Sequence, residues 1–206
     1  MEFDLYEAVS ALQKEIRRGH EREALFWAFQ LVGIGEEQHL WTRLEVISHE
    51  DIGIAAPMAS LCISTWARTF RFFRSIHRDG CARLILANAI SLLSRSPKSR
   101  HADYLQCVVS DDVARGVKLE VPSYAVDRHT RRGRKMGRGV RHWIEEGCRL
   151  EPAPDAAFEV YRQEAESRWL AGVHKLDWSG KRSDTANLFE ESKGESDDSS
   201  NEESTE

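Results

Sequence analysis

The chain lacks the long apolar runs and paired cysteines that mark membrane and disulfide-rich proteins. No apolar run approaches the roughly 18 to 20 residues that span a bilayer, and residues 1–4 are acidic where a secretory signal is basic. Cys62, Cys81, Cys107 and Cys148 are scattered without a C-x-x-C pair. We therefore expect reduced cysteines in helical cores rather than disulfides or a zinc site. We also expect no membrane contact and a cytoplasmic location, nucleoid-associated, or nuclear if the source has a nucleus.

Motifs for nucleotide binding and for catalysis are also absent. No G-x-x-x-x-G-K-[ST] loop occurs, and the nearest fragment, GKRS at residues 180–183, lacks the glycine-rich lead. The H-E-x-x-H zinc motif is excluded because Gly53 occupies its fifth position after His49. We expect no ATPase activity, no catalytic residue, no cofactor and no metal. An enzyme acting on nucleic acid stays an alternative, because one basic segment gathers acids and imidazoles: Asp127, His129, His142, Glu145 and Glu146.

The first half of the chain predicts a series of helices. Apolar residues recur at helical spacing between Asp4, a suitable N-cap, and Gly19, a suitable stop. Residues 23–32 are apolar nearly all round, which favours a buried central helix. Residues 40–47 predict a third helix, and residues 57–79 predict a long fourth one that starts at a proline. We expect the aromatic residues here to lie in the core, and any exposed together to mark an oligomer interface: Trp27, Phe29, Trp66, Phe70, Phe72 and Phe73.

Helical patterns continue in shorter pieces along the rest of the body. Residues 81–93 predict a fifth helix, which Pro97 interrupts because proline removes a backbone donor. Residues 101–109 and 112–116 are separate short helical candidates, whereas residues 118–122 alternate and end in proline, which favours an extended connector. A last helix is expected over residues 156–170, with Asp155 as its N-cap.

The charge of the chain is unevenly distributed. Residues 181–206 hold nine acidic and three basic side chains, so residues 1–180 carry about +1 although the whole chain carries −5. From residue 179 onward almost no apolar residue occurs, and such a segment cannot bury enough surface to offset its ordering entropy. We expect a disordered acidic tail that either aids solubility or competes with DNA for cations.

The cations gather in a second segment, Arg128 to Arg149, which holds eight Lys or Arg side chains. Arginines neutralise phosphates, glycines let backbone amides approach the same oxygens, and Trp143 or Tyr124 offers a surface on which an unpaired base can stack. The alternative is a solvated face, or one that docks on acidic helices of a neighbouring subunit. We expect the nucleic-acid contacts to come from Arg131, Arg132, Arg134, Lys135, Arg138 and Arg141, with Lys98 and Arg100 extending the same surface.

Two neighbouring carboxylates, Glu50 and Asp51, form an acidic turn. Such a pair can bind a metal or act as acid and base. Adjacent residues at a helix end nevertheless point in different directions, and acidic residues at such a junction ordinarily cap backbone amides. We therefore expect a structural turn, made with Gly53, Pro57 and Pro97.

Four stretches of the chain also carry a family resemblance. Residues 43–57 read RLEVISHEDIGIAAP and residues 92–99 read LLSRSPKS, and they follow VSALQKEIR at residues 9–17 and ALFW at residues 24–27. In order and spacing this resembles the helical C-terminal region of clamp-loader-like AAA+ ATPases of the replication-associated recombination type, RarA or MgsA. The resemblance covers roughly residues 4–126, and the sequence beyond departs from the pattern.

The helical patterns, the charge distribution and the resemblance together predict an all-α protein with three parts. Residues 1–126 would form a multi-helix bundle like a clamp-loader C-terminal domain, residues 127–178 a basic Arg/Gly-rich helical extension, and residues 179–206 the disordered tail. The resemblance also implies a homo-oligomer, since in this family the corresponding region is responsible for tetramer formation and the whole protein works at stalled forks.

The function expected from this resemblance is a non-catalytic role in DNA replication or repair. The chain would bind single-stranded or forked DNA without sequence preference, or a replication or repair protein, or a separate ATPase. A purely structural assembly protein is a further alternative.

Overall fold

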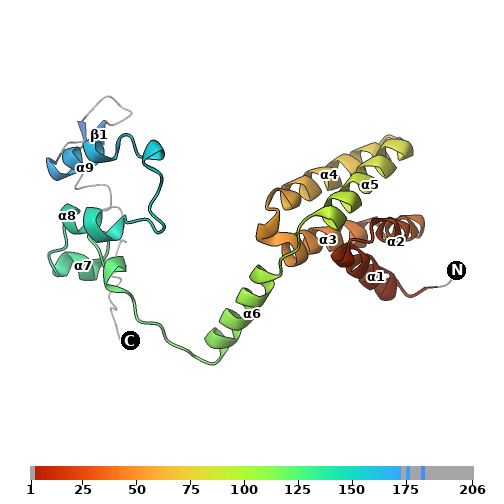
Figure 1. The fold of residues 1–206 in the computed structure, drawn as a ribbon, viewed down its shortest axis with the longest axis horizontal. Helices are drawn as coiled ribbons and strands as arrows, with labels where there is room; N and C mark the ends of the chain where they lie inside the picture. Colours follow the sequence, from red (N-terminus) through yellow and green to blue (C-terminus); the bar gives the residue numbers. More distant parts are fainter. Residues whose placement is uncertain (1–2, 173–174, 177–181, 184–206) are drawn as a thin grey trace, which may run out of the picture. The chain divides into compact units, whose positions relative to one another are not determined.

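The computed structural model describes residues 3–172, 175–176 and 182–183, and it divides the chain into two units (Figure 1). Unit 1 is Met1–Lys118 and unit 2 is Leu119–Glu206. The architecture is all-α, as the sequence predicts, apart from one antiparallel pair of two-residue strands, β1 (Lys175–Leu176) and β2 (Arg182–Ser183). The expected disordered tail otherwise lies outside the described residues. None of the described helices is both long and apolar enough to cross a membrane.

Unit 1 contains six α-helices and a short irregular corner. The corner follows the third helix and consists of a π-helix, η1, and a 3-10 helix, η2. In chain order the elements are α1 (Leu5–Arg18), α2 (Glu21–Gly33), α3 (Glu37–Ile47), η1 (Ser48–Ile52), η2 (Gly53–Ala55), α4 (Met58–Ser75), α5 (Asp79–Arg95) and α6 (His101–Ala114).

Helix α1 forms as its sequence predicts. The side chain of Asp4 accepts a hydrogen bond from the amide of Glu7 at 3.0 Å, which satisfies one of the free N–H groups at the helix start. Gly19 ends the helix with φ +80°, a left-handed conformation that favours glycine. Leu12 and Ile16 are fully buried, so the predicted apolar face meets the core.

The core of unit 1 lies between α1, α2, α3 and the antiparallel pair α4 and α5, which lie side by side in Figure 1. Trp41 on α3 and Phe70 on α4 are its largest buried side chains, with ring centroids 5.3 Å apart. Burial of such rings supplies about 2 to 3 kcal/mol each. This contact joins the first three helices to the α4–α5 pair.

Several core assignments made from the sequence are wrong. Phe29 is 38% exposed and Phe72 is 56% exposed, and α2 buries only small residues and Leu31 instead of forming a central helix. Cys81 and Cys107 are exposed, although no cysteine of the described residues forms a disulfide. Periodicity identifies residues that share a helix face, but it does not say whether another element covers that face.

Helix α6 is continuous where the sequence suggested two pieces. Pro97 does end α5, and the amine of Lys98 then donates to the carbonyl oxygens of Leu93, Ser94 and Ser96 at 2.7–2.9 Å. No residue of α6 is buried. The connector that follows it is irregular, as expected for residues 118–122.

A cluster of charged side chains, which we call the acidic corner, joins α1, η1 and α6. Asp51 is 1% exposed, and its carboxylate accepts from Arg17 Nε at 2.8 Å and from Gln13 Nε2 at 3.1 Å. Glu50 accepts from Arg17 and from Arg100, at 3.1 and 2.9 Å. The carboxylates therefore bind side chains from distant helices, whereas the sequence suggested capping of local amides.

The backbone of the acidic corner turns where the sequence expects it. Gly53 has φ +49°, the left-handed conformation that glycine tolerates best. Pro57 directly precedes the first residue of α4, and the carbonyl oxygen of Asp51 accepts from the amide of Ser99 at 2.9 Å. This bond holds the segment after Pro97 against η1.

Unit 2 is built from short elements with little core of its own. They are η3 (Ser123–Ala125), α7 (Arg131–Lys135), α8 (Val140–His142), η4 (Trp143–Gly147), η5 (Ala156–Phe158) and α9 (Arg162–Leu170). The helix expected over residues 156–170 is therefore interrupted, since η5 ends at Phe158 and α9 begins at Arg162. Val126 is its one buried apolar side chain among the described residues.

Candidate nucleic-acid interface

The basic segment of unit 2 is organised by a turn that starts at Asp127. Its carboxylate accepts from the amide of His129 at 2.9 Å and contacts the ring Nδ1 at 2.8 Å. Burial would raise the pKa of Asp127, but the hydrogen bonds from His129 outweigh this effect and hold the pKa below its usual value. The ionised carboxylate therefore stabilises the turn, and this stabilisation is lost as the pH falls through the acid range.

Helix α7 begins directly after this turn. Thr130 is its N-cap, and the hydroxyl accepts from the amide of Gly133 at 2.9 Å. Gly133 is buried so closely against Asp127 that a Cβ would lie 1.8 Å from the carbonyl oxygen of that residue. The glycine is therefore needed for the helix to start at this place.

The cations expected to bind DNA have different surroundings. Arg138 donates to the carbonyl of Val126 at 2.5 Å and to the hydroxyl of Ser123 at 2.8 Å, so it ties the segment to η3. Arg134 donates to the carbonyl of His129 at 3.3 Å. Arg141 is 3.8 Å from Glu145, on an exposed surface. These three side chains have structural contacts.

Three of the four exposed cations of α7 have no such contact within the part of the chain that the structure describes. Arg131, Arg132 and Lys135 make no side-chain hydrogen bond or ion pair with any residue that the structure describes. Residues three and four apart lie on one helix face, so Lys135 is a neighbour of both arginines. We call these three side chains the α7 face.

Lys98 and Arg100 lie in unit 1. The Lys98 amine caps the end of α5, as described above, and burial lowers its pKa. Arg100 contacts Glu50, Asp103 at 2.6 Å and the ring of Tyr104. Desolvation would lower the pKa of Arg100, yet the carboxylates of Asp103 and Glu50 raise it. Both side chains help to hold unit 1 together.

The two aromatic residues expected to stack on bases, Trp143 and Tyr124, also differ in how far they are exposed. Trp143 packs between His129, 5.7 Å away, and Trp169, 5.0 Å away, measured between ring centroids. Tyr124 is 59% exposed. Of the two, Tyr124 has the ring that is free to stack on a base.

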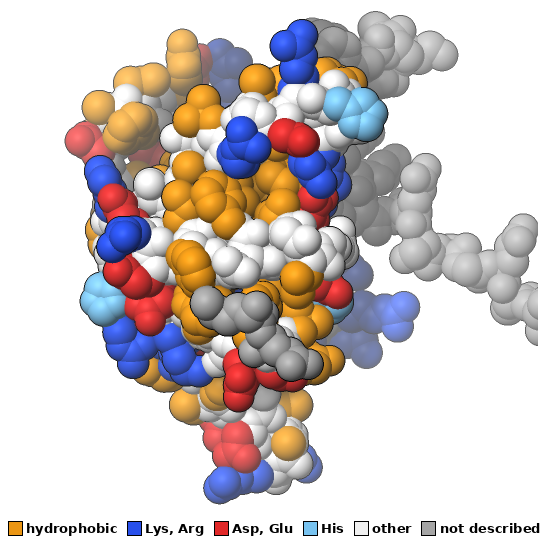
Figure 2. All heavy atoms as spheres, turned by 90° about the vertical axis from the view of Figure 1, so that its right-hand side faces the viewer, with side chains coloured by type: hydrophobic (Ala, Val, Ile, Leu, Met, Phe, Trp, Pro, Cys, Tyr) orange, Lys and Arg blue, Asp and Glu red, His pale blue; other side chains and the backbone are white. Residues whose placement is uncertain are grey.

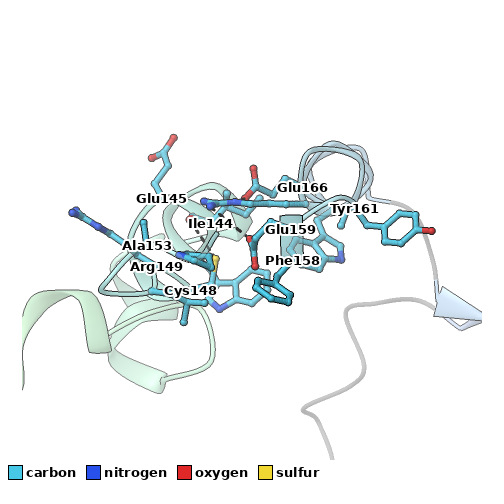
Figure 3. A pocket seen from close by; sticks show the side chains of 15 residues that line it. Ile144, Glu145, Cys148, Arg149, Ala153, Phe158, Glu159, Tyr161 and Glu166 are labelled. Atoms are coloured by element: carbon cyan, nitrogen blue, oxygen red, sulfur yellow. Dashed lines mark hydrogen bonds and ion pairs between the residues drawn. The ribbon is translucent and has the colours of Figure 1, made fainter. Parts of the chain in front are cut away.

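A hollow of about 850 Å3 lies within unit 2 between η4, the loop that follows it, and α9. Trp143, Phe158 and Trp169 supply its apolar wall, and Figure 3 shows the sulfur of Cys148 near its middle while Tyr161 and Arg149 point away. Cys148 Sγ donates to the carbonyl of Ile144 at 3.3 Å. Glu159, Arg162 and Glu166 also line the hollow, so its surface is both apolar and charged.

The acid and imidazole set of the alternative enzyme is only partly assembled. Asp127 and His129 contact each other, but Glu145 and Glu146 are exposed. His142 Nδ1 is buried without a hydrogen bond to a described residue. Across the described ranges, no three His, Cys, Asp or Glu side chains are placed to hold a metal ion.

Comparison with known proteins assigns the chain to a family. Residues 19–147 match the family described as MgsA AAA+ ATPase C terminal. The chain belongs to this family. The matched range continues past residue 126 through α7 and η4. Most of the basic segment thus lies within the range that matches the family.

Two relatives agree with this assignment. The chain is 32% identical over 169 residues to Replication-associated recombination protein A of Bacillus subtilis, covering 77% of this chain and 39% of the relative. It is 29% identical over 125 residues to an AAA domain-containing protein of Mycobacterium tuberculosis, covering 60% of this chain and 27% of the relative. The chain thus spans well under half the length of these relatives. What is detected is the C-terminal, non-ATPase domain of the family.

The sequence reasoning missed two groups of residues. The acidic corner joins residues more than thirty positions apart, such as Arg17 and Asp51, and no local pattern gives that pairing. A second set of arginines lies on α4, and its signal is visible in the sequence: no Asp or Glu occurs between Asp51 and Asp79.

Proposed function

We propose that this chain is a non-catalytic module for DNA replication or repair, which binds single-stranded or forked DNA through the α7 face. The observation that carries the proposal is the exposure of Arg131, Arg132 and Lys135 on one side of a helix without carboxylate partners among the described residues. Uncompensated cations bind phosphates by releasing counterions. The name of the Bacillus relative, a replication-associated recombination protein, supports the same role.

The test is binding of the full chain to a fluorescent single strand and to a fork, measured by anisotropy over a salt series. Arg131→Gln, Arg132→Gln and Lys135→Gln together remove three phosphate contacts. We expect about tenfold weaker binding or more, and a log–log salt slope that is shallower by about 2, since each contact on a single strand contributes about 0.7.

A matched control removes the same charge elsewhere. Arg115, Arg149 and Arg168 are exposed arginines with ion-pair partners of their own, so their triple replacement by Gln tests net charge alone. Equal loss of binding in both triple variants would contradict a contact at the α7 face. Full retention of binding by the α7 variant would do so as well.

We further propose that the module assembles with copies of itself through α6. Within its own unit this helix exposes an apolar surface that includes Leu105 (54% exposed), Val109 (48%) and Val113 (70%). Leu105, Val109 and Val113 follow at intervals of four residues, so they lie on one face. Exposed apolar faces of this kind commonly mark an interface.

Assembly is tested by light scattering after size exclusion. Leu105→Glu with Val109→Glu is expected to reduce the mass to that of one chain, because charges on a buried apolar face are costly. Gln106→Glu with Ser110→Glu is the matched control on the same helix, since both residues are exposed. An unchanged mass in the first variant, or a wild-type chain that is already monomeric, would contradict assembly through α6.

A further inference from the structure

Helix α4 of unit 1 and the turn that follows it carry arginines and no acidic side chain. Between Asp51 and Asp79 the sequence contains Arg68, Arg71, Arg74 and Arg78 and no acidic residue. Surface helices usually mix both signs of charge along one face. The single sign along α4 therefore needs its own explanation.

The positions of these arginines define a face. Arg68, Arg71, Phe72 and Ser75 follow the i, i+3, i+4, i+7 spacing, so they lie on one side of the helix. All four are exposed, and the buried residues of α4, such as Ile63 and Phe70, lie on the other side, toward α3 and α5. We call the side with Arg68, Arg71, Phe72 and Ser75 the α4 face. Arg78 follows in the turn between α4 and α5.

The arginines of the α4 face differ from Arg74 in their ion pairing. Arg74, which lies off the face, binds Glu37 at 2.8 Å and Asp79 at 2.6 Å. Arg68, Arg71 and Arg78 have no side-chain hydrogen bond or ion pair to any described residue. The nearest carboxylates along the chain are engaged elsewhere: Asp79 binds Arg74 and Asp51 binds Arg17. Glu45 accepts from Ser64 at 2.8 Å.

Favourable placement at the helix end does not account for all three arginines. Cations in the last turn of a helix interact with its dipole, which applies to Arg74 and to residues beyond it. Arg68 lies two turns before the end at Ser75, where that effect has vanished. Its exposure without a partner among the described residues is one argument for a ligand.

The length of the face and its aromatic residue indicate the class of ligand. A helix rises about 1.5 Å per residue, so Arg68 to Ser75 spans about 10 Å, enough for more than one backbone phosphate of a strand. Phe72 is 56% exposed beside the arginines, with its ring 5.5 Å from that of Phe73. An aromatic ring among cations is the arrangement on which unpaired bases stack.

The surface of unit 1 at the end that carries the tips of α4 and α5 also shows this mixture. Figure 2 views that end, where apolar side chains form a contiguous area with basic and acidic side chains around it. A fully acidic peptide would pair with the cations but would make no contact with the ring of Phe72.

We propose that the α4 face is a second nucleic-acid contact, which holds a single strand by its phosphates and stacks one base on Phe72. The site is built from residues of unit 1 and shares none with the α7 face, so neither proposal requires the other. The arginines supply affinity without sequence preference, and Phe72 restricts the contact to unpaired bases.

The test uses the full chain and a fluorescent oligothymidine. Arg68→Gln, Arg71→Gln and Arg78→Gln together should weaken binding by about tenfold and flatten the salt slope by about 2, whereas the Arg115, Arg149 and Arg168 control should not. Phe72→Ala should weaken single-strand binding several-fold and leave duplex binding unchanged. Circular dichroism melting confirms that each variant folds.

The outcomes distinguish the two proposals. A loss only in the α4 triple supports this face and counts against the α7 face, and the reverse pattern overturns the α4 face. Competition by polyglutamate of equal charge as effective as that by oligothymidine would also overturn it, in favour of an acidic protein partner. The proposal is also overturned if the Arg68, Arg71 and Arg78 variant binds oligothymidine with the same affinity as the Arg115, Arg149 and Arg168 variant.

Discussion

Replacing Arg17 with methionine is expected to lower the free energy of unfolding of unit 1 by about 3 kcal/mol, within the range for breaking a buried ion pair. Asp51 is 1% exposed and takes its shortest hydrogen bond, 2.8 Å, from Arg17. Without that arginine the carboxylate keeps Gln13 at 3.1 Å and Arg100 at 3.7 Å. A buried charge with weakened pairing is costly because water cannot replace the lost partner.

The measurement is urea unfolding followed by far-UV circular dichroism. Asp51→Asn removes the charge that needs the arginine, so the double variant should lose clearly less than the sum of the two single losses. Arg43→Met is the matched control, because Arg43 contacts Gln13 at 3.2 Å and no carboxylate of the acidic corner among the described bonds. Additive losses would contradict a direct coupling of Arg17 and Asp51.

Replacing Gly133 with alanine is expected to disrupt the turn and the start of α7 while unit 1 stays folded. The added Cβ would lie 1.8 Å from the oxygen and 2.5 Å from the carbonyl carbon of Asp127, both backbone atoms. A contact that short requires the backbone to move, and overpacking of this kind costs about 3 kcal/mol. The three cations of the α7 face would then lose their common direction.

Hydrogen exchange resolves the effect by region. Amides of residues 129–138 should lose protection in Gly133→Ala, and those of α3 should keep theirs. Gly139→Ala is the control, since a Cβ there meets open space. Unchanged exchange in the Gly133 variant would show that the turn can shift without cost, against the geometry described.

The elements that the sequence predicted well are those set by local chemistry. Asp4 caps α1, Gly19 ends it, and Pro97 follows the end of α5, because each effect acts within a few residues of the chain. The family motifs likewise identified the fold class and the acidic turn. Local rules suffice where both partners are neighbours in sequence.

For the misassigned residues, burial depends on whether another element of the fold packs against their helix face. Phe72 and Cys107 lie on helix faces that no other described element of unit 1 covers, although their patterns are those of core residues. The acidic corner needs Arg17, Asp51 and Arg100 from three elements. The site prediction could name the cations of residues 128–149, but only the fold separates Arg138, which binds backbone carbonyls, from the exposed α7 face.

Val126 is the one described apolar side chain that unit 2 buries. A unit with so small a core gains little from the hydrophobic effect against the entropy of ordering its backbone. Any ligand or neighbouring copy that prefers its ordered form therefore contributes directly to its folding free energy. Folding of unit 2 and binding of its ligand are then coupled. The affinity measured for that ligand includes the free-energy cost of ordering the loops of unit 2.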